Sequence, residues 1–170
     1  SVVGLVIGTR PDCVDEEKLD YLAELAKRAV VIVEYGIESC YDSTLQRINR
    51  GHDFETARRA IGMTAARGID VGAHFILGLP GETLQMAMES TRHAVTAGTD
   101  GVKFHLLHVI DHTDLAKLYR AGEFEVLTME RYFELLAGCI RRIPEDMVVP
   151  FFIYGKGFEG GAQFESMSLL

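Results

Sequence analysis

Short apolar runs alternate with amphipathic segments along most of this chain, and few folds accept that order. The apolar runs are rich in β-branched residues and are typical of strands. Five of them are expected, at Val2–Gly8, Val30–Ile37, Ile69–Leu77, Gly101–Val109 and Val148–Tyr154. Strands that alternate with helices favour a parallel sheet with right-handed crossovers.

The segments between the strands carry apolar residues at helical spacing and polar residues that suit helix ends. Asp15, Asp42 and Asp53 are expected to cap helices, because a short oxygen-bearing side chain can accept a hydrogen bond from the first turn. The helix after Asp42 is expected to run through Ile48, and further helices are expected over Glu82–Ala97, Thr113–Tyr119 and Thr128–Arg142.

The fold class that follows is α/β, built from parallel β/α units. Four or five such units form about half of an eight-stranded TIM-type barrel, or one doubly wound sheet. The chain has 170 residues, which suits a single domain. We expect one partial barrel over residues 1–154 and a glycine-rich loop or tail over 155–170.

One face of the expected sheet is polar where a buried parallel sheet is usually apolar. Alternation along each strand places these side chains together: Glu34, Gly36, Glu38, Gly72, His74, Ile76, Lys103 and His105. Because an unpaired buried charge is costly, the pattern predicts a concave face lined by water or ligand. The alternative is internal ion pairing, for example of Glu34 or Glu38 with Lys103.

Composition excludes several classes of function. The net charge of −8 argues against a broad nucleic-acid surface, and no apolar run is long enough to span a membrane. We therefore expect a cytoplasmic protein without membrane contact. The three cysteines, Cys13, Cys40 and Cys139, are far apart and lack CxxC spacing, so we expect neither a disulfide framework nor a metal site.

Several motifs, in order along residues 2 to 150, resemble the radical S-adenosylmethionine (SAM) superfamily, and a set in order is far more specific than any one alone. The strongest are Glu34–Ser39 (EYGIES), Arg47–His52 (RINRGH) and His74–Thr83 (HFILGLPGET). They resemble the branch of elongator-type and oxygen-independent coproporphyrinogen oxidase-like proteins. Ile7–Cys13 (IGTRPDC) and Lys103–Val109 (KFHLLHV) resemble a bacterial group within that branch.

The resemblance implies a SAM site at the strand ends. Its expected residues are Glu38, Ser39, Arg50, His74, Ile76, Gly78 and His105. Glu38 or Arg50 would hold the amino-acid end of SAM, and Ile76 would contact adenine. The chain departs from the family pattern at Glu38, where a glutamine is usual, at His74, where an aspartate often holds the ribose, and at Gly8, where a carboxylate often contacts SAM.

The same resemblance implies a [4Fe–4S] cluster held by three cysteines after the first strand of the barrel. No CxxxCxxC motif occurs here, and the chain resembles the family from about its third strand onward. We therefore expect the cluster ligands to lie in a longer parent enzyme, with an electron donor and an unidentified substrate. Alone, the chain is expected to be inactive and to self-associate through the apolar edge strand Val2–Gly8.

Two other functions stay open on the sequence. A TIM-barrel lyase or aldolase would use Lys103 as a Schiff-base nucleophile on the fourth strand. A non-catalytic ligand-binding domain would keep the concave face without any cluster.

Overall fold

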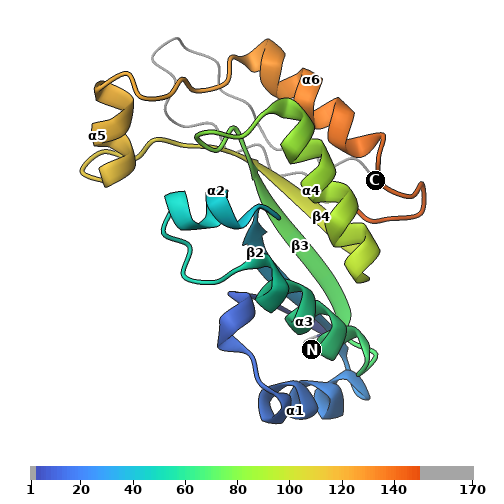
Figure 1. The fold of residues 1–170 in the computed structure, drawn as a ribbon. Coiled ribbons are helices and arrows are strands. Elements are labelled where there is room, and N and C mark those ends of the chain that lie inside the picture. The colour runs from blue at the N-terminus through green and yellow to red at the C-terminus, as the bar shows by residue number, and fades with distance from the viewer. Residues whose placement is uncertain (1–2, 150–170) are drawn as a thin grey trace.

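A computed structural model describes residues 3–149 (Figure 1). Its strands are β1 (Gly4–Thr9), β2 (Val30–Glu38), β3 (Asp70–Leu77) and β4 (Gly101–Leu106). Its helices are the 3-10 turn η1 (Pro11–Cys13) and α1 (Glu16–Ala26), α2 (Asp42–Arg47), α3 (Phe54–Ala65), α4 (Leu84–Ala97), α5 (Asp114–Arg120) and α6 (Met129–Ile140). The predicted alternation of strand and helix is confirmed.

The four strands form one parallel sheet in the order β1-β2-β3-β4. Sequential order with all strands parallel is that of a β/α barrel, whereas a doubly wound sheet reverses its order at a switch point. Helices α1, α3, α4 and α6 pack against a single face, and α2 and α5 lie beyond the carboxyl ends of the strands (Figure 1). The fold is therefore a partial α/β barrel, as predicted.

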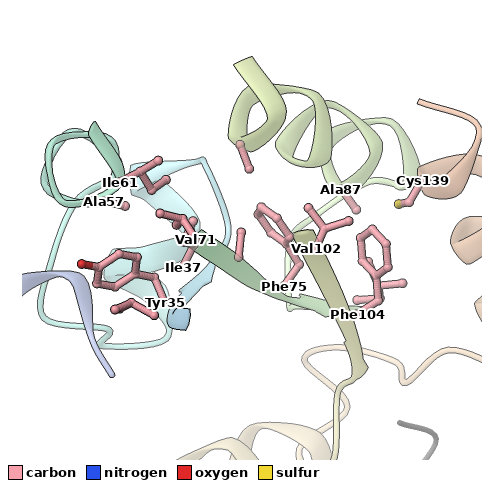
Figure 2. Packing of buried hydrophobic residues seen from close by; sticks show 14 of the residues in the cluster. Tyr35, Ile37, Ala57, Ile61, Val71, Phe75, Ala87, Val102, Phe104 and Cys139 are labelled. Atoms are coloured by element: carbon pink, nitrogen blue, oxygen red, sulfur yellow. The ribbon is translucent and has the colours of Figure 1, made fainter. Parts of the chain in front are cut away.

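The hydrophobic core lies between that face and its helices. Alternate residues of β2, β3 and β4 point into it, and Ala57, Ile61, Ala87 and Cys139 meet them from α3, α4 and α6 (Figure 2). The largest side chains with almost no exposed surface are Tyr35, Phe75 and Phe104. The one polar group of this trio is satisfied, because the Tyr35 hydroxyl lies 2.7 Å from Oγ1 of Thr64.

Most helix ends follow the predicted chemistry, with one correction. The carboxylates of Asp15 and Asp53 accept from the backbone N–H groups of Lys18 and Thr56, as expected for N-caps. Asp42 is instead the first helical residue of α2, and its carboxylate accepts from the backbone N–H of Phe54. The prediction of Asp42 as a cap was wrong, because its side chain joins two helices rather than closing one.

The largest difference from a predicted strand boundary is at the end of β4. β4 ends at Leu106, three residues early, which leaves His108 exposed in the following loop. Val148 forms an isolated parallel bridge with Gly101 beside β4, at the start of the expected fifth strand. The remainder of that strand and the predicted tail at 155–170 lie outside the described residues.

Candidate functional site

The face of the sheet opposite the helices carries the predicted polar side chains. Glu34, Glu38, His74, Lys103 and His105 all lie there, neither deeply buried nor freely exposed. The residues that alternate with them along the strands, such as Val33, Ala73 and Val102, are buried against the helices. The two-sided character predicted from alternation is therefore confirmed, and the charged side chains form two groups on the concave face.

The first group is an ion pair at the carboxyl end of β2. The guanidinium of Arg50 lies 3.2 Å from the Glu38 carboxylate, and it also donates to the backbone carbonyl of Gly36 through Nη2 at 2.5 Å. A Cβ on Gly36 would lie 2.5 Å from the same nitrogen and 2.6 Å from Oε1 of Glu38. Glycine is thus needed at position 36 so that the pair can lie directly on the strand.

The backbone of the α2–α3 connection fixes where Arg50 points. Asn49 is left-handed, with φ of 52°, and its N–H donates to the carbonyl of Gln46, while the N–H of Arg50 donates to that of Leu45. These two bonds form a Schellman motif, which closes α2. Arg50 therefore ends the helix through its backbone and reaches Gly36 through its side chain. A contact between Arg50 and SAM stays a prediction.

Glu38 has an unusual backbone. Its φ is 69°, a left-handed value that is uncommon for a residue with a side chain, and the β2–β3 register shifts between Gly36 and Glu38. This bulge turns the Glu38 carboxylate toward Arg50 at the strand end. Burial raises the pKa of Glu38, and the Arg50 guanidinium opposes that rise. Backbone strain that aims a half-buried carboxylate is a feature of functional sites.

Ser39 is placed differently from the other predicted contacts. It is fully buried, its hydroxyl donates to the Glu82 carboxylate, and it accepts from the backbone N–H of Tyr41. Burial raises the pKa of Glu82, against the effect of its hydrogen bonds with Ser39 and Thr44. Glu82 thus ties the β2–α2 loop to the β3–α4 loop. A contact between Ser39 and SAM stays a prediction.

Ile76 and Gly78 lie at the carboxyl end of β3. Ile76 is half-buried on the concave face, and Gly78 follows the strand with φ of 92° beneath the side chain of Leu127. β3 is the strand next to the Glu38–Arg50 pair, and His105 on β4 is the register partner of Ile76. The arrangement therefore brings Glu38, Arg50, Ile76, Gly78 and His105 to one end of the sheet.

The second group lies deeper on the same face. Nε2 of His74 is 2.9 Å from Oε2 of Glu34, and Nζ of Lys103 is 3.7 Å from the same oxygen. The rings of His74 and His105 are 5.2 Å apart. The alternative of internal ion pairing is therefore partly realised, with Lys103 against Glu34, whereas Glu38 pairs with Arg50.

The sequence predicted only part of this second group as site residues. His74 and His105 were predicted as SAM contacts, but Glu34 was not among the predicted site residues. The signal that identifies Glu34 is register, because Glu34 stands opposite Gly72, two residues before His74 on the neighbouring strand. Predicted alternation gives the face of each side chain but not its level relative to the next strand.

The described residues fit SAM better than they fit an iron–sulfur cluster. Among residues 3–149, no three histidine, cysteine or acidic side chains are grouped so that they could hold a metal ion. In addition, burial raises the pKa values of half-buried Cys40 and buried Cys139, which disfavours the thiolate that a cluster requires. In contrast, the Glu38–Arg50 pair offers both charges that the amino-acid group of SAM would meet.

No helix in the described part of the chain is long and apolar enough to cross a membrane.

Two family models match the chain. The model of the radical SAM superfamily matches residues 1–94, and that of the radical SAM C-terminal domain matches residues 99–150. Protein YhcC of Escherichia coli is 37% identical over 149 residues, which cover 87% of this chain and 48% of YhcC. The chain thus spans about half the length of that curated relative.

More distant matches include a solved structure. The tRNA uridine(34) acetyltransferase of Methanocaldococcus infernus is 29% identical over 138 residues, 79% of this chain and 25% of that protein. The structure of Elp3 from M. infernus, with an N-terminal deletion, superposes with a TM-score of 0.77 at 28% identity over 88% of this chain and 35% of that one.

Proposed function

Because this chain belongs to the radical SAM superfamily, in the branch of elongator-type and oxygen-independent coproporphyrinogen oxidase-like proteins, we propose that it forms the SAM-binding part of a radical SAM enzyme. The observation that carries this proposal is the Glu38–Arg50 pair, held over Gly36 at the carboxyl ends of the strands. Ligands of β/α barrels bind at that end of the sheet.

Four residues are proposed to hold SAM. Arg50 would bind the carboxylate of its methionine part and Glu38 the ammonium group, each exchanging part of its present ion pair for a ligand contact. Ile76 and Gly78, on the next strand, would lie against adenine. When bound next to a reduced [4Fe–4S] cluster, SAM supplies a 5′-deoxyadenosyl radical that removes a hydrogen atom from the substrate.

Residues 3–149 do not provide a group of side chains that could hold the cluster. We propose that a longer protein, of the length of its relatives, supplies the three cysteines and receives electrons from a donor protein. The name of the archaeal relative refers to tRNA, but only 25% of that protein is matched and this chain carries a net charge of −8. These observations do not support a tRNA substrate for this chain, and the cytoplasmic location stays a prediction.

The lyase alternative is less well supported. A Schiff-base lysine is usually activated by an apolar pocket or a second cation. Lys103 instead lies against the Glu34 carboxylate, at 3.7 Å.

Replacing Arg50 with alanine in the full-length, cluster-bearing protein is expected to weaken SAM binding by about 1–3 kcal/mol, roughly 5- to 150-fold in Kd, because a charge-assisted hydrogen bond is lost. Isothermal titration calorimetry under anaerobic conditions measures the change. Arg59→Ala is the matched control, since it removes the same charge from an exposed position on α3. An Arg50→Ala protein that binds SAM as tightly as the control would leave Arg50 with its helix-closing role alone.

A further inference from the structure

We propose that Glu34 and His74 form a proton-transfer pair that acts on the substrate, with Nδ1 of His74 as the base. The pair is part of the second polar group on the concave face and is distinct from the residues proposed above for SAM. The inference rests on the proposed function only in placing a substrate inside the barrel. It reassigns His74 from the predicted ribose contact to the substrate.

The pair is built by the register of β2 and β3. Glu34 stands opposite Gly72, and a Cβ on Gly72 would come within 3.0 Å of Cγ of Glu34. Glycine at 72 therefore lets the Glu34 side chain lie across β3 and reach His74, two residues further on. The register of the two strands thus places the Glu34 carboxylate within hydrogen-bond distance of the His74 imidazole.

The hydrogen bond fixes which nitrogen of His74 is available. An ionised carboxylate can only accept, so the 2.9 Å contact with Oε2 of Glu34 requires the hydrogen of His74 to be on Nε2. In the neutral ring Nδ1 then carries a lone pair. A carboxylate that orients a histidine in this way also stabilises the imidazolium that forms when the ring accepts a proton.

The surroundings of His74 favour the neutral form of its ring. Burial lowers the pKa of His74, Glu34 acts to raise it, and Lys103 on β4 acts to lower it. His105, the other titratable group facing this ring, has its own pKa lowered by burial and by the neighbouring His74 and Lys103. A neutral imidazole is the form that accepts a proton.

There is room for a substrate group next to the pair. A hollow of about 160 Å³ borders Glu34, Gly72, His74 and Lys103 and extends from them toward the residues that begin β3 and β4. His74 is also the register partner of Gly36, over which Arg50 and Glu38 lie. The proposed base therefore stands between the proposed SAM site, at the carboxyl ends of the strands, and the hollow on its amino-terminal side, which a substrate held in the barrel would enter.

The proposed step is a simple proton transfer. An acidic O–H bond of the substrate breaks, its electron pair stays on the substrate oxygen, and a new N–H bond forms at Nδ1 of His74. The positive ring is then balanced by Glu34, and Lys103 borders the place where the negative substrate atom would lie. The substrate class is therefore a polar molecule with an acidic hydroxyl group, such as an enol or a phenol.

Diethyl pyrocarbonate tests the state of His74, because this reagent reacts with an unprotonated imidazole nitrogen. In the full-length protein at pH 7 we expect His74 to be modified, and Glu34→Gln to slow its reaction by about tenfold or more, since the orienting carboxylate is lost. The exposed His93 serves as an internal reference and should react at the same rate in both proteins. An unreactive His74, or a rate that Glu34→Gln leaves unchanged, would overturn the proposal.

Two further measurements separate this proposal from the SAM site and from a folding defect. His74→Gln should leave the affinity for SAM unchanged, whereas a loss like that of Arg50→Ala would make His74 a SAM ligand instead. If Glu34→Gln fails to fold, nitrogen-15 NMR of the unaltered protein decides, with Nε2 protonated and Nδ1 bare as the expected result. The opposite tautomer would exclude Nδ1 as a base.

Discussion

Replacing Phe104 with alanine is expected to lower the free energy of unfolding by about 3–5 kcal/mol. Phe104 is 1% exposed in the middle of β4, and its ring stacks on that of Phe75 with centroids 6.2 Å apart (Figure 2). Both rings fill the space between the sheet and helices α4 and α6. Because the surrounding side chains are closely packed, they cannot fill the cavity that the substitution leaves. The loss combines the transfer energy of the ring with the cost of the cavity left behind.

Chemical denaturation monitored by circular dichroism measures this change. Phe133→Ala is the matched control, because Phe133 is 44% exposed on α6 and its removal leaves no closed cavity. The control is expected to change the stability by less than about 1 kcal/mol. If both variants lowered the free energy of unfolding by a similar amount, the side chains between β4 and α6 would not form a closely packed core.

The fold was largely predictable because its signal is periodic. Apolar residues at every second position of the second and third strands, such as Val33, Tyr35 and Phe75, are the ones the structure buries. Parallel order and helices on one face then follow from the handedness of β/α units. Predictions were wrong where a long-range contact decided the outcome, as at Asp42, whose carboxylate joins the start of α3 instead of capping α2.

The candidate site was less predictable because it depends on register and backbone strain. Arg50 was predicted from a motif, but its contact with the carbonyl of Gly36 depends on the Schellman turn at Asn49. The bulge that turns Glu38 requires a left-handed φ, and a glutamate at this position does not predict one. Glu34 reaches His74 only because Gly72 lies between them, and that pairing is a property of the assembled sheet.

Replacing Leu5 and Val6 together with lysine is expected to convert a self-associating chain into a monomer. Among the described residues, β1 pairs only with β2 and forms one edge of the sheet. Leu5 is 42% exposed and Val6 58%, and the strand holds no charged residue that would discourage pairing with another chain. We therefore expect two copies to associate through this edge.

The expected size of the effect follows from the area that association would bury. Full burial of a Val or Leu side chain contributes about 1.5–3 kcal/mol, and about half of each side chain is already covered. Two side chains in each of two copies then contribute about 3–6 kcal/mol in total, so the double variant should raise the dissociation constant by roughly 100-fold or more. Sedimentation velocity over a range of concentrations measures it.

Tyr21→Lys is the matched control, because Tyr21 is 66% exposed on α1 and does not belong to the edge strand, and it should leave the association unchanged. An unaltered chain that stays monomeric at all concentrations would contradict the prediction. In a protein of the relatives' length, we expect the preceding strand of the barrel to occupy this edge. In that longer protein the lysine substitutions should lower the free energy of unfolding and should not change self-association, because the same apolar contacts would lie within one chain.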